Sequence, residues 1–312
     1  MTPTILLLTP FTERFMQRLH QHFTVIDASS WPDILAGLQG QEDQVWAVIT
    51  SAVKGVPDNV IQQLPQLKAI SVRGVGLDQV NLALARDCGV KVSSTTGILS
   101  DCVADLAFSL LLAVSRQIPL ANDFVRSGQW QNQGFPLASR VNRKRIGILG
   151  LGAIGSLIAQ RAAGFDMEIA YYGRRSKSGV SYAFFDDVQA LAAWADYLVV
   201  AVPGGSQTDG LISAAVLEAL GPSGVLVNIA RGSVVDEQAL LEALRNKVIA
   251  GAGLDVYTTE PCPPQPWKDL DNVVLTPHIG SATRETRQAM EDLVLDNLIA
   301  LHQQGHLLTP VD

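Results

Sequence analysis

Short runs of apolar residues alternate with amphipathic segments along most of the chain. In the first third of the chain, such runs predict strands at Thr4–Thr9, Val45–Thr50, Lys68–Val72 and Val90–Ser93. Apolar positions at helical spacing predict helices over Glu13–His22, from near Pro57 and over Asn81–Arg86. Strands that alternate with helices in this way are typical of a parallel sheet covered by helices on both faces.

A second series of strands follows a long apolar helix and an irregular segment. The helix is predicted over about Asp101–Arg116, and the polar segment Ser127–Asn142 has no regular pattern. The second series of strands is predicted at Arg145–Leu149, Glu168–Tyr172, Tyr197–Val202, Val225–Asn228, Ile249–Asp255 and Val273–Leu275. The last helix, about Thr283–Gln303, ends before Gly305, a residue type favoured after helix ends. Because it follows a complete second sheet, we expect it to pack back on the first unit.

Length and charge exclude several classes of protein. The chain has 312 residues, enough for about two domains. Its formal net charge of −7 argues against nucleic acid or an anionic membrane as a partner. The most apolar stretches, Val103–Val114 and Leu191–Pro203, are too short to span a bilayer. The three cysteines have neither metal-ligand nor redox spacing, so we expect a cytoplasmic protein without a metal site.

A glycine-rich segment follows the predicted strand Arg145–Leu149 and opens an apolar helix. Gly150 permits a tight turn, Gly152 lets the backbone approach a pyrophosphate, and Gly155 lets the helix pack close to the strand. The amides of Gly152, Ala153 and Ile154 would then point at the phosphates from a helix N-terminus. We interpret the segment as a dinucleotide-binding turn, the alternative being a glycine-rich turn without a ligand.

The residues after the next strand indicate which dinucleotide binds. An NAD site places Asp or Glu at the end of that strand, where it binds the ribose 2′-hydroxyl. Here the strand Glu168–Tyr172 is followed by Gly173 and then by Arg174, Arg175, Ser176 and Lys177. Arginine suits a phosphate because its planar guanidinium donates two hydrogen bonds at once. We therefore expect NADP(H) as the cofactor, unless this is only a solvated basic loop.

Three residues that can carry chemistry follow other strands of the second series. His278 comes just after Val273–Leu275, Arg231 after Val225–Asn228, and Glu260 after Ile249–Asp255. Residues at the carboxyl ends of strands in such sheets face the ligand crevice. Arg231 can hold a carboxylate and polarise a carbonyl, His278 can supply a proton near neutral pH, and Glu260 can orient and charge the imidazole. Taken singly, each could be a surface charge.

Over nearly its whole length the chain resembles the D-specific 2-hydroxyacid dehydrogenases. The resemblance rests on the segments Arg73–Asp78, Gly150–Gly155, Asn228–Asp236, Gly253–Pro261 and Thr276–Gly280. Within that family the chain is most similar to NADPH-preferring glyoxylate/hydroxypyruvate reductases and to hydroxyphenylpyruvate reductases. The resemblance implies that Arg231, Glu260 and His278 are catalytic. It also implies that substrate is bound by the backbone amides of Val75 and Gly76, which contact its carboxylate, and by Arg231 and His278. It further implies that the cofactor site also includes Val202, Pro203, Ala230, Arg231, Asp255, His278 and Gly280.

The resemblance also implies an architecture and a reaction. We expect two Rossmann-like α/β domains, one flavodoxin-like and one dinucleotide-binding, with parallel sheets and a cleft between them. Residues 1–98 and 286–312 would bind substrate, and residues 99–285 would bind NADP and form a homodimer, with Phe135 near the partner's cleft. The expected reaction reduces a small 2-keto acid to the D-2-hydroxy acid. Alternatives are an aryl pyruvate or other 2-keto acid as substrate, or a non-catalytic NADP(H)-sensing protein.

One position departs from the family pattern. Where family members often have an aromatic or small residue, this chain has Arg73.

Overall fold

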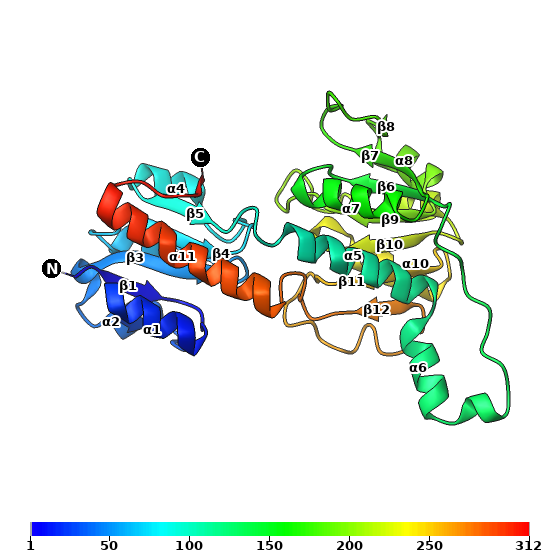
Figure 1. Cartoon of the computed structure of the whole chain (residues 1–312), viewed down its shortest axis with the longest axis horizontal. Helices are drawn as coiled ribbons and strands as arrows, with labels where there is room; N and C mark the ends of the chain where they lie inside the picture. The colour runs from blue at the N-terminus through cyan, green and yellow to red at the C-terminus, as the bar shows by residue number, and fades with distance from the viewer. Residues whose placement is uncertain (1, 312) are drawn as a thin grey trace. The chain divides into compact units, whose positions relative to one another are not determined.

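Apolar strands and amphipathic helices build two separate α/β units in the computed structural model, which describes residues 2–311 (Figure 1). The terminal unit comprises Met1–Leu99 and Thr283–Asp312, and the central unit comprises Ser100–Ala282. Each unit has its own sheet and its own core.

The terminal unit is built on a six-stranded sheet in the order β13-β5-β4-β3-β1-β2. Its strands are β1 (Thr4–Leu7), β2 (Thr24–Asp27), β3 (Val45–Ser51), β4 (Ala69–Arg73), β5 (Lys91–Ser94) and β13 (Pro310–Val311). Strands β1 to β5 pair in parallel, and the short β13 is antiparallel to β5. The helices are α1 (Glu13–His22), α2 (Ile34–Leu38), the 3-10 turn η1 (Glu42–Gln44), α3 (Asp58–Gln63), α4 (Leu82–Asp87) and α11 (Arg284–Gln304).

Helix α11 belongs to the terminal unit although it follows the whole central unit in sequence. Its residues Val294, Leu295 and Leu298 share one core with Ile5 and Leu7 of β1. The opposite face of the sheet has a core of its own. The central strands are therefore buried on both faces, as parallel sheets require.

The central unit has a seven-stranded parallel sheet in the order β12-β11-β10-β9-β6-β7-β8. Its strands are β6 (Arg145–Leu149), β7 (Glu168–Tyr172), β8 (Ala183–Phe185), β9 (Tyr197–Val200), β10 (Val225–Asn228), β11 (Gly251–Leu254) and β12 (Val273–Leu275). Its helices are α5 (Ser100–Ser115), α6 (Ile118–Arg126), α7 (Ala153–Ala163), α8 (Val188–Trp194), α9 (Ala214–Leu220) and α10 (Glu237–Arg245), with 3-10 turns η2 (Gln129–Gln131) and η3 (Gly232–Val234).

Several elements differ from the sequence-based expectation. The strand expected over Tyr197–Val202 ends at Val200, and that expected over Ile249–Asp255 spans Gly251–Leu254. Strands β2 and β8 were not predicted, since each is short and neither has a buried residue. The stretch expected to be irregular over Ser127–Asn142 contains η2.

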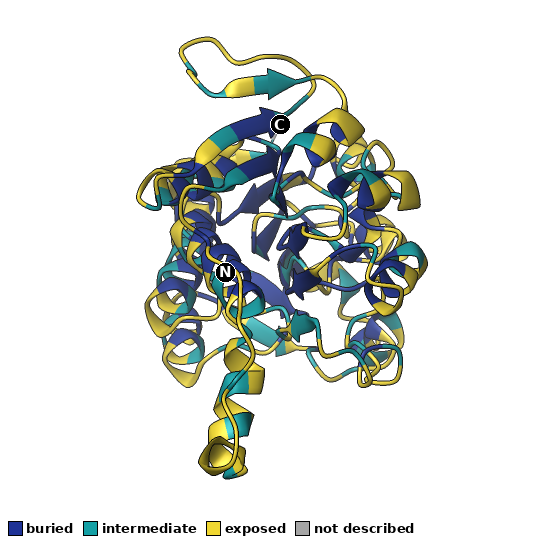
Figure 2. Cartoon of the chain, turned by 90° about the vertical axis from the view of Figure 1, so that its right-hand side faces the viewer, coloured by how far each residue is buried: buried dark blue, intermediate teal, exposed yellow. Residues whose placement is uncertain are grey.

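Helix α6 and η2 form an arm on the central unit with an unburied apolar surface. No residue of α6 is buried, and Ile118, Val125 and Trp130 are 53%, 55% and 68% exposed. In Figure 2 the arm is intermediate or exposed along its length, whereas many strands of the sheets are buried. Phe135 is half-buried and packs edge-on against Phe124, with ring centroids 5.3 Å apart. No single helix within residues 2–311 is long and apolar enough to cross a membrane. Helices α5 and α6 together have the required length and composition, but their axes are bent by 58° at the break between them.

Candidate active site

The predicted site residues of the central unit follow the ends of neighbouring parallel strands. The register aligns the last residues of β6, β9, β10, β11 and β12, which are Leu149, Val200, Asn228, Leu254 and Leu275. One to three positions later come Gly150, Val202, Ala230, Asp255 and His278. The chain thus gathers these residues along one edge of the sheet, where such folds bind ligands.

The glycine-rich turn has the geometry that a pyrophosphate needs. Gly150 has a φ of +91°, which other residues rarely adopt. A Cβ on Gly155 would lie 2.0 Å from the Gly150 carbonyl oxygen, so only glycine allows this close approach of helix and turn. A Cβ on Gly152 would meet nothing within 4 Å, and α7 begins there without a side-chain cap. Open space and uncapped amides at the start of a helix fit an anionic group.

The basic loop lies beside this turn. Strands β6 and β7 pair so that Leu149 is level with Tyr172, and the loop after β7 carries Arg174, Arg175 and Ser176, all exposed. The Lys177 side chain donates a hydrogen bond to the Leu151 carbonyl oxygen of the glycine-rich turn. The sequence showed Lys177 as one of the cations after β7, but it did not indicate that this side chain would connect the loop after β7 to the glycine-rich turn.

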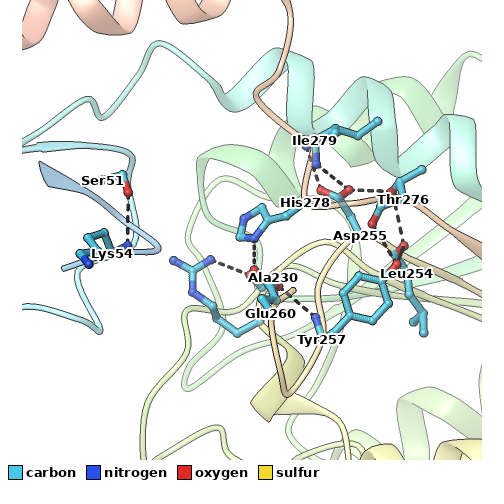
Figure 3. Close-up of polar contacts among 12 residues, drawn as sticks. Ser51, Lys54, Ala230, Leu254, Asp255, Tyr257, Glu260, Thr276, His278 and Ile279 are labelled. Atoms are coloured by element: carbon cyan, nitrogen blue, oxygen red, sulfur yellow. Dashed lines mark hydrogen bonds and ion pairs between the residues drawn. The ribbon is translucent and has the colours of Figure 1, made fainter. Parts of the chain in front are cut away.

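His278, Glu260 and Arg231 come together at the same edge of the central unit. His278 Nδ1 lies 2.7 Å from Glu260 Oε2, and Figure 3 shows the imidazole turned toward the carboxylate. The Tyr257 amide donates to Glu260 Oε1 at 3.1 Å and fixes that carboxylate. Arg231 donates from Nη1 to the Ala230 carbonyl at 2.7 Å.

The charge of Glu260 is stabilised despite its partial burial. Burial alone would raise the pKa of Glu260, but the hydrogen bond and charge of His278, the Tyr257 amide and the nearby Arg231 together lower it below its usual value. Glu260 is therefore ionised near neutral pH. An ionised carboxylate 2.7 Å from the imidazole favours the protonated imidazole, which can act as a general acid.

Asp255 holds the loop that carries His278. Its carboxylate is 1% exposed and accepts hydrogen bonds from the amides of Ile279 and Gly280, both at 2.8 Å, and from the Thr276 hydroxyl at 2.6 Å. Burial raises the pKa of Asp255 in spite of these bonds and the charge of His278, which act in the opposite direction. His278 itself has a φ of +53°, a left-handed conformation that only a well-anchored non-glycine residue keeps.

In the terminal unit, Val75 and Gly76 follow the end of β4. The Gly74 amide donates to the Thr95 hydroxyl at 3.0 Å, which fixes the start of this loop. Val75 is 36% exposed and Gly76 is partly exposed.

Residues 108–280 match the family model described as the NAD-binding domain of D-isomer specific 2-hydroxyacid dehydrogenases. The chain is 43% identical over 309 residues to a 2-ketogluconate reductase of Gluconobacter oxydans, covering 99% of this chain and 98% of the relative. It is 41% identical to a hydroxyphenylpyruvate reductase of Plectranthus scutellarioides, with 98% of each chain covered. The crystal structure of an NADPH-dependent glyoxylate/hydroxypyruvate reductase from Sinorhizobium meliloti, in complex with NADP and malonate, superposes with a TM-score of 0.92 at 37% identity and covers 100% of this chain and 97% of that one.

Fold and site together define a two-domain α/β oxidoreductase with a dinucleotide-binding domain. The chain belongs to the D-isomer specific 2-hydroxyacid dehydrogenase family. The family, the fold class and the enzyme class predicted from the sequence are confirmed.

Proposed function

We propose that the protein reduces a small 2-keto acid of the glyoxylate or hydroxypyruvate type to the D-2-hydroxy acid with NADPH. The observation that carries the proposal is the 2.7 Å contact between His278 Nδ1 and Glu260 Oε2, beside Arg231, at the ligand-binding edge of the dinucleotide-binding sheet. Each reductase named above acts on a 2-keto acid according to its name, which supports the same substrate class here.

Each of the three residues has a distinct task in this proposal. When bound, the reduced nicotinamide supplies a hydride to the carbonyl carbon. Glu260 holds Nδ1 of the protonated imidazole, so Nε2 of His278 gives its proton to the carbonyl oxygen and the product is an alcohol. Arg231 binds the substrate carboxylate and polarises the carbonyl. In the terminal unit, the amides of Val75 and Gly76 are proposed to bind a substrate carboxylate.

The choice of NADPH rests on the loop after β7. Arg174 and Arg175 are exposed there, no carboxylate stands at the end of the strand, and Lys177 bonds to the glycine-rich turn. A 2′-phosphate on the ribose would find charge-assisted donors at this position. The NADP complex of the Sinorhizobium reductase supports the same choice.

We also propose that the protein is a cytoplasmic homodimer and that the arm of α6 and η2 carries the interface. The exposed Ile118, Val125 and Trp130 give this arm an apolar surface unusual for a monomer. Part of the Phe135 ring packs against Phe124 of the same chain.

Steady-state kinetics test the function. NADPH oxidation is measured with glyoxylate, hydroxypyruvate and 4-hydroxyphenylpyruvate, for the natural chain, for His278→Ala and for His20→Ala, a control at an exposed histidine of α1. We expect turnover of at least one substrate and a kcat roughly 100- to 10,000-fold lower in His278→Ala only. NADPH binding without oxidation by any of the three acids would indicate a non-catalytic sensor instead, and a normal kcat in His278→Ala would refute the assignment.

A further inference from the structure

Arg73 ends strand β4 in a largely buried position of the terminal unit. Its guanidinium carbon lies 4.2 Å from the centre of the Phe11 ring, in the loop after β1. The side chain is 13% exposed, and Nε is buried without a hydrogen-bond partner among residues 2–311. A buried guanidinium with an unused donor is costly, so its environment or a ligand must compensate for it.

Among residues 2–311, the carboxylate paired with Arg73 is that of Glu291. Glu291 of α11 is 2% exposed and lies 3.6 Å from Arg73 Nη1. It also accepts hydrogen bonds from the amide of Thr12, at 3.3 Å, and from the Thr12 hydroxyl. Glu291 is therefore shared between Arg73 and the loop after β1, and its distance from Arg73 is longer than that of a good charge-assisted hydrogen bond.

A second arginine shares the same carboxylate. Arg287 precedes Glu291 by one helical turn on α11 and is partly buried. Burial and the charge of Arg287, only partly offset by Glu291, lower the pKa of Arg73 to about 10. Burial also lowers the pKa of Arg287, although Glu291 acts in the opposite direction. Two guanidinium groups beside one carboxylate leave this cluster with one surplus positive charge.

Arg73, which contributes to this surplus charge, ends the strand that leads into the loop to which the proposed function assigns the substrate carboxylate. Arg73 directly precedes Gly74, Val75 and Gly76 in sequence. We propose that Arg73 and Arg287 form a subsite for a second anionic group of the substrate, so that the enzyme prefers 2-keto acids with a distal carboxylate or phosphate over 2-keto acids of similar length that lack one. This inference rests on the proposed function and specifies its substrate class.

Paired substrates test the subsite. We compare kcat/KM for 2-oxoglutarate with that for 2-oxohexanoate, and for 3-phosphohydroxypyruvate with that for hydroxypyruvate. In the natural chain we expect the member with the distal anionic group to be preferred by roughly tenfold or more in at least one pair, as a charge-assisted contact would give. The pair with the larger preference identifies the distal group as carboxylate or phosphate. Equal kcat/KM within both pairs would overturn the inference.

Variants separate recognition from folding. Arg73→Met should reduce the preference for the substrate with the distal anionic group roughly tenfold and change kcat/KM for its partner without that group by less than about threefold. Arg73→Lys, which keeps the charge, should retain part of the preference. Arg287→Met should act in the same direction and serves if Arg73→Met does not fold. Arg86→Met, at an exposed cation of α4, is the matched control and should leave the preference unchanged. An equal loss for both members of a pair would show a structural role only.

Binding without chemistry distinguishes the two proposals. Isothermal titration with 2-oxoglutarate, or with 3-phosphohydroxypyruvate if that pair shows the larger preference, uses enzyme saturated with NADP⁺, which cannot reduce a keto acid. We expect the Kd to rise roughly tenfold in Arg73→Met. Binding that depends on Arg73 together with no reduction of any keto acid would refute the proposed function and leave the subsite standing. Binding that is the same in the natural chain and in Arg73→Met would refute the subsite.

Discussion

Replacement of Glu260 by glutamine removes a charge from His278 while keeping the shape of the side chain. In the natural chain the charge of His278 lowers the pKa of Glu260. Linkage requires the reverse effect to have the same free energy, so the Glu260 carboxylate stabilises the protonated imidazole. In Glu260→Gln this charge is absent, and the alkaline fall in kcat/KM for keto-acid reduction should begin at lower pH.

The contact geometry sets the size of this shift. A hydrogen bond to a charged group contributes roughly 1.5–3 kcal/mol. The His278 and Glu260 side chains are 32% and 22% exposed, so solvent screening favours the lower end of that range, about 1.5 kcal/mol. Since one pH unit corresponds to about 1.4 kcal/mol, the alkaline limb should move down by about one unit. Weaker orientation of the imidazole should lower the plateau by about tenfold.

The assay is kcat/KM for hydroxypyruvate reduction with NADPH from pH 5 to 9. Glu237→Gln is a matched control, because the Glu237 carboxylate accepts the Thr258 amide at 3.0 Å just as Glu260 accepts the neighbouring Tyr257 amide. It should leave the limb in place. An unmoved limb in Glu260→Gln, or an equal shift in both variants, would refute the role of Glu260. Solvent isotope effects on kcat/KM, measured over the same pH range, show whether the chemical step limits the rate.

Three further predictions concern the cofactor, the glycine-rich turn and the arm. The double variant Arg174→Ala, Arg175→Ala should raise KM for NADPH by roughly 30-fold or more, because about 2–4 kcal/mol of charge-assisted contact is lost. KM for NADH, measured by initial rates in the same way, should stay nearly unchanged. An equal rise in both KM values would exclude a role of the two arginines in binding the 2′-phosphate. Gly155→Ala should lower Tm, because its Cβ would lie 2.0 Å from the Gly150 oxygen, whereas Gly152→Ala should keep Tm and weaken NADPH binding in calorimetry, since its Cβ points into open space. Trp130→Glu with Leu137→Glu, at side chains 68% and 98% exposed, should convert a dimer into monomers in sedimentation velocity at micromolar concentration; a natural chain that sediments as a monomer would contradict this.

The position of the candidate site could be predicted because it depends on strand ends. Apolar runs locate β10 and β12, and the polar residues that follow them are Arg231 and His278. In a parallel sheet all carboxyl ends lie at one edge, so residues far apart in sequence could be assigned to one site without coordinates. The same reasoning placed the glycine-rich turn after β6.

The anchoring of the site could not be predicted in the same way. Asp255 is predicted to line the cofactor site, and the sequence did not indicate that its carboxylate also bonds to Ile279, Gly280 and Thr276 and so holds the left-handed turn at His278. Helix α6 was missed, and none of its residues is buried. The contact of Glu291 with Thr12 spans 279 positions, and no local pattern indicates a pairing of that length.

Charge explains why these anchoring details matter for ligand binding. The chain carries a net charge of −7, while NADPH and a 2-keto acid are both anions. At physiological ionic strength surface charges are screened beyond about 8 Å, so affinity depends on cations close to the ligand. Arg174 and Arg175 are exposed, and salt weakens their contacts with a phosphate. Arg73 is largely buried beside Glu291, where screening is weak and the protein itself sets the field. If both proposals hold, cofactor affinity should therefore fall as ionic strength rises, whereas substrate preference should depend on the packing around β4 and α11.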